Sequence, residues 1–309
     1  RLIRRILLCV GIFELTGAIL LYIRFAPQMG AVTGAYYAVF HAVSAFCNAG
    51  FDLMGRFEPY TSLVPYRGDA LVNLTVMTLI IVGGLGFVVW DDLIEHRLRL
   101  SRCRLHTKVV LVSTLILITL GAIMFYWLER DYSLALMNGG ERLLASLFQS
   151  VTPRTAGFNT VDTAAMGEGG TVLSMLLMMI GASPGSTGGG MKTTTVVVII
   201  LSTVSYIRNS DDINLFHRRL DDSVLKRAYG NATIYMMLAL SGIFLLMVTQ
   251  GLPLKEVSFE VMSAIGTVGL STGITRELNG LSRLIIIALM YSGGSTKHMR
   301  FIKGDVSVI

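Results

Sequence analysis

Long apolar segments separated by short polar ones set the pattern of this chain. A helix that crosses a bilayer needs about 20 mostly apolar residues. Four segments meet this requirement: Leu7–Ile23, Leu71–Trp90, Val109–Trp127 and Ala228–Leu252. Two others are apolar but of unsuitable length, because Thr171–Ile207 is too long for one straight span and Leu281–Gly294 is too short. The pattern predicts an all-α membrane protein.

Three shorter, semi-apolar segments lie between these spans. They are Tyr36–Asn48, Arg142–Thr155 and Val257–Thr267. Each amounts to about three turns of helix, which is too short to cross a bilayer and is the length expected of a re-entrant segment. We therefore predict units of the form span, re-entrant helix, span.

Lys and Arg residues are distributed unevenly among the loops. They gather before the first span, in residues 97–108 and 208–227, and near the C-terminus, whereas the other loops hold few of them. Cytoplasmic loops carry the excess of basic residues in membrane proteins. We expect both termini to be cytoplasmic and the re-entrant segments to enter from the outside.

Composition supports the membrane assignment and excludes other classes. Hydrophobic residues make up 53% of the 309 residues and charged ones only 15%, whereas soluble domains carry about a quarter. The net charge of +6 does not indicate nucleic-acid binding, because the basic residues lie in loops between spans. Cys9, Cys47 and Cys103 show no disulfide or metal-ligand spacing. We expect no transition-metal site and no organic cofactor, and the first span reads as a retained anchor.

The three short segments end in related sequences. They read "FHAVSAFCNAGFD" (Phe40–Asp52), "LFQSVTPRTAGFN" (Leu147–Asn159) and "FEVMSAIGTVGLS" (Phe259–Ser271). Each contains a glycine-centred tetrapeptide, and the twelve residues are Asn48, Ala49, Gly50, Phe51, Thr155, Ala156, Gly157, Phe158, Thr267, Val268, Gly269 and Leu270. We divide the chain into repeats 1–96, 108–207 and 228–294, joined by cytoplasmic loops 97–107 and 208–227 and followed by a cytoplasmic tail, 295–309.

These tetrapeptides have the chemistry of a monovalent-cation filter. Backbone carbonyls that point inward replace the hydration shell of a desolvated cation. A central glycine removes the Cβ that would crowd converging carbonyls, and the side chains of Asn48, Thr155 and Thr267 offer further oxygens at the inner edge. The short helix before each tetrapeptide aims its partly negative C-terminal end at the same point. Extended backbone is tolerated at membrane depth where it lines a water-filled path.

The stretch "GASPGSTGGGMK" interrupts the overlong segment Thr171–Ile207 and has three readings. It resembles the outline of a hydrolase nucleophile elbow, a damaged phosphate-binding loop, or a glycine-rich break in a membrane helix. Its notable residues are Gly181, Ser183, Pro184, Gly185, Gly188, Gly189, Gly190 and Lys192.

Its surroundings favour the helix break. A nucleophile elbow needs a preceding strand and a histidine partner, yet an apolar helix precedes Ser183 and the one histidine expected inside the membrane, His41, lies on a re-entrant segment. The phosphate-loop reading lacks the required spacing. Proline and four glycines lower the helix propensity of the stretch sharply. A membrane serine hydrolase that uses Ser183 remains as an alternative.

The "NAGF", "TAGFN" and "TVGLSTG" motifs, spread over nearly the whole chain, resemble those of the Trk/Ktr/HKT superfamily of potassium transporters. The resemblance implies four repeats about a pseudo-fourfold pore, filter glycines associated with K⁺ selectivity, and gating by the broken helix at 181–192. It also implies a homodimer in the bacterial inner membrane, seated on a cytosolic ring of nucleotide-binding (RCK) subunits. Potassium is then the transported ion, with a sodium-permeable or Na⁺/K⁺-coupled transporter as the alternative.

The chain departs from that family in two places, and the residues beside the tetrapeptides give further expectations. Only three of four repeats are present, the first being expected before Arg1. The last helix looks incomplete, because glycine stands at Gly294 where the family has arginine, so residues are expected to be missing between Gly293 and Lys297. Arg154 is expected to form a structural ion pair. Asp52 and Asn159 are expected to shape an outer vestibule.

Overall fold

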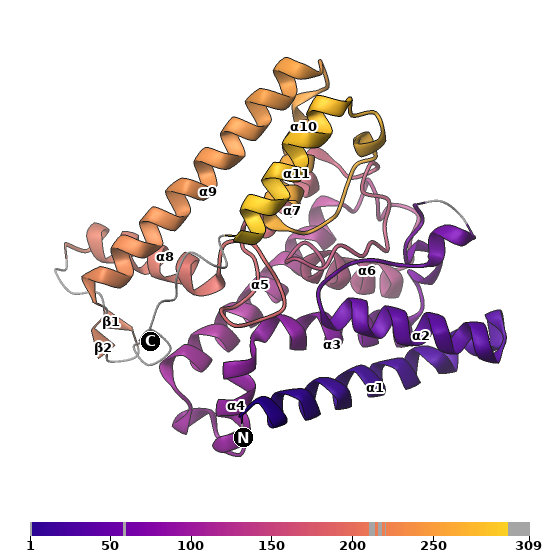
Figure 1. Cartoon of the computed structure of the whole chain (residues 1–309), viewed down its shortest axis with the longest axis horizontal. Coiled ribbons are helices and arrows are strands. Elements are labelled where there is room, and N and C mark those ends of the chain that lie inside the picture. Colours follow the sequence, from indigo (N-terminus) through magenta and orange to yellow (C-terminus); the bar gives the residue numbers. More distant parts are fainter. Residues whose placement is uncertain (1, 58–59, 210–213, 216–217, 220, 296–309) are drawn as a thin grey trace.

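The protein is described by a computed structural model over residues 2–57, 60–209, 214–215, 218–219 and 221–295. Its fold is almost entirely helical (Figure 1). The α-helices are α1 (Leu2–Met29), α2 (Ala31–Phe46), α3 (Ala70–Leu85), α4 (Phe87–Glu95), α5 (Leu105–Leu128), α6 (Gly139–Val151), α7 (Glu168–Met179), α8 (Thr193–Ile207), α9 (Asp222–Thr249), α10 (Leu254–Gly266) and α11 (Gly280–Ser295). Two-residue strands β1 (Asn214–Leu215) and β2 (Arg218–Arg219) pair antiparallel in the loop before α9.

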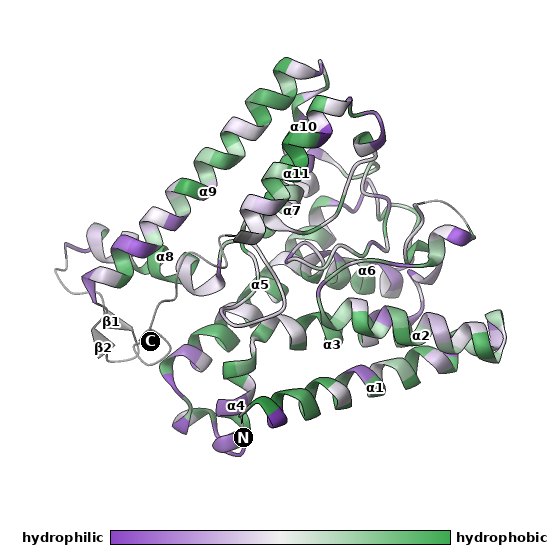
Figure 2. Ribbon diagram, in the orientation of Figure 1, coloured by the Kyte–Doolittle hydropathy of each residue, from purple (hydrophilic) through white to green (hydrophobic). Residues whose placement is uncertain are grey.

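Three helices within the described residues are long and apolar enough to cross a membrane by themselves: α1, α5 and α9. Apolar residues run along the length of these helices, and polar residues gather in the connecting loops (Figure 2). Because a helix satisfies its own backbone hydrogen bonds, it is the form that such apolar segments take in lipid. These three confirm the spans predicted for the same regions.

The span predicted at Leu71–Trp90 is wrong as a single helix. The chain forms α3 and α4 instead, which meet at an angle of 89°. Gly86 makes the bend, with φ 97°, a left-handed backbone angle that costs glycine little. The amide freed by the bend at Phe87 donates to the main-chain oxygen of Gly185, at 3.0 Å, so a loop distant in sequence replaces the lost helical acceptor.

The overlong apolar segment is broken where the sequence predicted. Helix α7 ends at Met179 and α8 begins at Thr193, so residues 180–192 form a loop between them. We call these thirteen residues the intramembrane loop. Ile180 and Met191 form an isolated parallel bridge across its base, so the two ends of the loop lie side by side.

Three short helices match the predicted re-entrant segments, and each begins earlier than expected. Helices α2, α6 and α10 start at Ala31, Gly139 and Leu254. Helix α6 begins where Asn138 and Glu141 form a reciprocal capping box, an arrangement that satisfies two free amides at a helix start. Helices α2 and α10 begin without a side-chain cap, so this explanation applies to α6 alone.

The short helices pack between the long ones. Helix α2 lies on α1 and α3, α6 lies on α5, and α10 lies between α9, α11 and α7 (Figure 1). A large apolar cluster under the first two units includes Phe25, Phe46, Phe148 and Phe158, all fully buried. A second cluster joins α9, α10 and α11 around Tyr235 and Ile265. The C-terminal ends of the three short helices are thereby held in the interior.

The last predicted element agrees in position with α11. The tail expected at 295–309 lies outside the described residues from 296 on, and so does Lys297, the far boundary of the expected missing stretch.

Candidate functional site

The three glycine-centred tetrapeptides share one unusual backbone conformation. The first and third residues of each have positive φ: 50° and 70° at Asn48 and Gly50, 78° and 86° at Thr155 and Gly157, and 52° and 91° at Thr267 and Gly269. The residue between them is not in that region. Backbone that alternates in hand turns successive carbonyls toward the same side.

A hydroxyl group near the C-terminal end of each short helix anchors the segment that follows it. Ser44 Oγ donates to the main-chain oxygen of Phe51 at 2.7 Å, and Thr152 Oγ1 donates to that of Phe158. In the third unit Ser263 Oγ accepts from the amide of Gly269, at 3.1 Å. Each tetrapeptide is therefore fixed to the C-terminal end of its own helix, whose partial negative charge favours a cation nearby.

The tetrapeptides lie side by side in chain order. A Cβ placed on Gly50 would lie 2.1 Å from the main-chain oxygen of Ala156, and one placed on Gly157 would lie 2.2 Å from that of Val268. A Cβ on Gly269 would meet nothing within 4 Å. The described residues therefore form three contiguous sides of a ring, with open space beside the third.

The intramembrane loop packs against the first residues of the tetrapeptides. A Cβ on Gly188 would lie 2.3 Å from Thr155 Oγ1, and one on Gly189 would lie 1.9 Å from Thr267 Oγ1. The side chain of Asn48 also faces Gly188. Only glycine permits so close an approach, so the loop is in direct contact with the inner residue of all three tetrapeptides.

Thr155 is notable because its hydroxyl is buried without a hydrogen-bond partner in the described part of the chain. A buried hydroxyl normally finds a partner. This oxygen lies between a tetrapeptide and the loop.

Hydrogen bonds hold the intramembrane loop in place from two directions. The amides of Ser183 and Thr187 donate to the main-chain oxygens of Gly84 and Gly83 near the end of α3. Thr187 Oγ1 donates to the main-chain oxygen of Phe46 at 3.1 Å, and Lys192 Nζ donates to that of Gly188 at 2.9 Å. The loop is thus tied to α3 and to the end of α2, and the Lys192 bond links two residues within the loop.

A polar cavity of about 440 Å³ opens on the outer side of the ring. It is lined by all three central glycines and by Asp52 and Asn159. The two residues expected at an outer vestibule therefore lie on one cavity that leads to the tetrapeptides.

Two acidic residues near this cavity were not predicted from the sequence as site residues. Asp162 lines the cavity itself. Glu260 is buried on α10 and accepts hydrogen bonds from Ser271 Oγ, at 2.8 Å, and from Thr275 Oγ1. A glutamate inside the apolar segment Val257–Thr267 was the signal available, because ionisable residues at membrane depth mark functional sites.

The ion pair expected for Arg154 is absent from the described residues. Its side chain is buried, yet its Nε has no hydrogen-bond partner and no carboxylate lies within ion-pair distance. The expectation assumed that a buried charge must be paired. The structure provides no such partner at this position.

The surroundings of Ser183 do not form a nucleophile site. Its Oγ is buried and lies 3.1 Å from Thr193 Oγ1. A catalytic serine requires a base within hydrogen-bond reach, and a threonine hydroxyl cannot serve as one. Ser183 instead joins the intramembrane loop to the first turn of α8.

Comparison with known proteins supplies the family. The family model TrkH, described as "Cation transport protein", matches residues 1–297. The chain is 39% identical over 282 residues to the Ktr system potassium uptake protein B of Bacillus subtilis, covering 91% of this chain and 62% of that protein. It is 38% identical to the potassium/sodium uptake protein NtpJ of Enterococcus hirae over 288 residues, with 91% and 62% covered.

A further relative and a solved structure agree. The Ktr system potassium uptake protein B of Vibrio alginolyticus is 35% identical, with 95% of this chain and 64% of that protein covered. The crystal structure of the potassium transporter TrkH from Vibrio parahaemolyticus matches with a TM-score of 0.75 at 18% identity, over 91% of this chain and 59% of that one. The chain thus spans less than two thirds of the length of these relatives. It belongs to the TrkH family of cation transport proteins.

Proposed function

We propose that the chain forms the conducting part of a potassium uptake protein, in which the twelve tetrapeptide residues build a carbonyl-lined selectivity filter. The observation that carries the proposal is the threefold recurrence of left-handed backbone at the first and third tetrapeptide positions, packed side by side. A chain that alternates in this way presents several carbonyl oxygens to one point, which is what a desolvated K⁺ requires.

Three features support a cation rather than an anion at this point. The C-terminal ends of α2, α6 and α10 meet at the ring, and helix C-termini carry partial negative charge. The unpartnered Thr155 hydroxyl offers an oxygen at the inner edge. Asp52 and Asp162 line the outer cavity together with one basic residue, Arg276, and the net negative charge raises the local concentration of cations.

We assign gating to the intramembrane loop. Gly188 and Gly189 lie against the inner threonines, so an ion that leaves the filter inward meets the loop first. Lys192 adds a positive charge whose Nζ binds the main-chain oxygen of Gly188. The loop must therefore move for ions to pass, and its hydrogen bonds set the cost of that movement.

The open space beside Gly269 supports a fourth side of the filter, supplied by polypeptide other than the described residues. The domain division at 1–96, 108–207 and 228–294 and the pseudo-fourfold arrangement belong to this proposal. The proposal also includes cytoplasmic termini, a location in the bacterial inner membrane, contact with lipid, a homodimer, and a cytosolic ring of RCK subunits.

Sodium permeation is the second candidate, because one relative is named a potassium/sodium uptake protein. The described filter segments all carry glycine at the centre, and we place potassium first on that ground. A hydrolase is set aside, because the relatives are named as uptake proteins and Ser183 lacks a base.

Rubidium and sodium uptake test the proposal in bacteria that lack their own potassium uptake systems. The protein is expressed from its complete reading frame, with Gly157→Ser as the variant and Gly230→Ala as the matched control, since a Cβ on Gly230 meets nothing within 4 Å. We expect rescue at low K⁺ by the parent and the control, and loss of K⁺ preference over Na⁺ in Gly157→Ser. Unchanged preference in Gly157→Ser at matched expression would show that the tetrapeptides are structural turns.

A further inference from the structure

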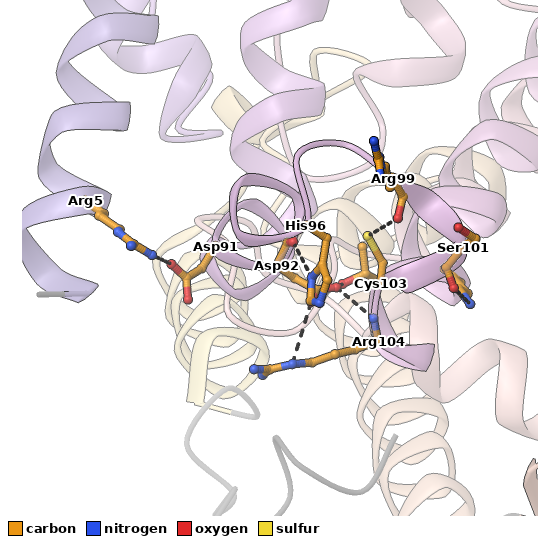
Figure 3. A network of polar contacts seen from close by, with 10 residues as sticks. Arg5, Asp91, Asp92, His96, Arg99, Ser101, Cys103 and Arg104 are labelled. Atoms are coloured by element: carbon orange, nitrogen blue, oxygen red, sulfur yellow. Dashed lines mark hydrogen bonds and ion pairs between the residues drawn. The ribbon is translucent and has the colours of Figure 1, made fainter.

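Three side chains with metal-binding atoms meet on the side of the molecule away from the filter, at the junction of α4 and α5. They are Asp92 and His96, on α4 and at its C-terminal end, and Cys103, in the loop before α5. One ligand atom from each lies within 4.8 Å of the others. Figure 3 shows the three gathered at one point with Arg104 alongside. The spacing of these residues in the sequence does not indicate a metal site, because the loop that returns Cys103 to the end of α4 cannot be predicted from that spacing.

The chain geometry fixes this cluster from both sides. Asp92 and His96 are four residues apart, which places them on one face of the helix. Asp92 Oδ2 accepts from the amide of Arg104 at 2.9 Å and from Thr107 Oγ1 at 2.5 Å. The carboxylate therefore holds the start of α5 against the end of α4, and Cys103 immediately precedes that anchor.

The second carboxylate oxygen of Asp92 is left over. Asp92 is 1% exposed, and its Oδ1 has no hydrogen-bond partner among the described residues. It lies 3.2 Å from His96 Nδ1 and 3.7 Å from Arg104 Nε. A buried carboxylate oxygen without a hydrogen bond is costly. His96 Nδ1 also lies 3.0 Å from the main-chain oxygen of Asp92, and Cys103 Sγ donates to that of Arg99 at 3.5 Å. A bound cation would replace these two contacts and supply Asp92 Oδ1 with the partner that it lacks.

The donor set selects the kind of ion. Carboxylate oxygen, imidazole nitrogen and thiolate sulfur together suit zinc and related divalent ions, and a thiolate disfavours Mg²⁺ and Ca²⁺. In a tetrahedral zinc site, ligand atoms lie about 3.3 to 3.8 Å apart. The observed cluster is within 4.8 Å, so small side-chain rotations bring the three atoms to that spacing.

The positive charges nearby do not prevent binding. The side chain of Arg104 is 52% exposed, and its guanidinium can turn to solvent. Cys103 and Asp92 are buried and together supply two negative charges once the thiol loses its proton to the metal.

We propose that Asp92, His96 and Cys103 form a binding site for a zinc-type divalent metal ion that joins the end of α4 to the start of α5. The site is independent of the selectivity filter. Arg5 Nη1 also donates to Asp91 Oδ1 at 3.1 Å (Figure 3), so the bound ion would stabilise a junction of three helices on this face.

Cobalt is the probe that reports on the cysteine directly. The tag-free protein in lipid nanodiscs carries Cys9→Ser and Cys47→Ser, which leaves Cys103 as the one cysteine of this chain. Cobalt(II) titration is expected to give one ion per chain, a thiolate-to-cobalt charge-transfer absorption, and displacement by zinc. His96→Gln is expected to weaken cobalt binding by at least about tenfold.

Cys103→Ser decides the assignment, and His96→Gln keeps the test usable if the serine variant does not fold. Thermal unfolding without metal shows which variants are folded. We expect the charge-transfer absorption to vanish in Cys103→Ser. A folded parent that shows no such absorption at excess cobalt overturns the proposal, as does an equal affinity in parent and His96→Gln.

Discussion

The contact between the intramembrane loop and the filter gives the sharpest quantitative prediction. In Gly189→Ala the new Cβ would lie 1.9 Å from Thr267 Oγ1, 3.0 Å from Thr267 Cβ and 3.2 Å from Thr267 Cγ2. The closest of these falls about 1.5 Å short of ordinary van der Waals contact. Rotation of the threonine relieves the hydroxyl clash, but its Cβ remains tight. Overpacking of this kind costs about 1–3 kcal/mol.

That cost falls on the closed arrangement, because the contact exists only while the loop lies under the filter. The closed-to-open equilibrium then shifts by about 5- to 150-fold toward open. We expect Gly189→Ala to raise the initial rate of rubidium uptake under conditions where the parent is mostly closed. Gly185→Ala is the control, because it is strained by φ 70° yet its Cβ meets only Val88, at 3.8 Å.

A second substitution tests the contact itself. Thr267→Gly removes the three atoms nearest to the new methyl group and suits the positive φ of 52° at this position. Gly189→Ala should therefore raise rubidium uptake less in a protein that carries Thr267→Gly than it does in the parent. If uptake in Gly189→Ala equals that of the parent at matched expression, or if the effect is undiminished with Thr267→Gly, the loop does not rest on the filter in the closed protein.

Three further predictions follow from single contacts. Lys192→Met removes the charged hydrogen bond to Gly188, so uptake should rise by about tenfold; an unchanged rate would remove Lys192 from the gate. Ser183→Ala loses only the hydroxyl contact between the loop and Thr193 at the start of α8, and rubidium uptake should stay within about threefold of the parent; complete loss would revive a chemical role for the serine. Asn138→Ala breaks the capping box of α6 at a cost of about 1 kcal/mol, which should lower Tm by about 2 °C in nanodiscs; an unchanged Tm would show that the cap contributes nothing.

Apolar length and recurring motifs were enough to predict much of this fold. Residues 109–127 and 228–249 lie in helices that can span, and the three short helices end beside the glycine tetrapeptides as expected. These features are local, since hydrophobic length and a glycine-centred turn are both written in consecutive residues. The placement of the intramembrane loop against the threonines could not be read in the same way, because it depends on contacts between distant segments.

The bend between α3 and α4 shows where hydropathy fails. Residues 71–90 are mostly apolar, and hydropathy does not distinguish a straight helix from a bent one. The bend needs both a left-handed glycine and an acceptor for the freed amide, and Gly185 supplies that acceptor from another unit. Gly83, Gly84 and Gly86 were the available signal, because glycine lowers helix propensity.

Buried charges were the other source of error. Arg154 was expected in an ion pair, a rule that holds for most buried charges, but pairing depends on what the tertiary fold places nearby. The cluster of Asp92, His96 and Cys103 was not predicted, because here the tertiary fold brings together residues whose spacing in the sequence is not that of a metal site. Its histidine and cysteine meet only because a turn at 97–102 reverses the chain.

The filter is the centre of this account, and ion density within it is the most direct test. Crystals of the complete protein grown with rubidium or thallium(I) would reveal these ions by anomalous scattering. We predict density on the axis bounded by the carbonyls around Gly50, Gly157 and Gly269, on the outer side of the intramembrane loop. Density confined to other sites, with none at the glycine tetrapeptides, would contradict the proposal that these segments form the filter.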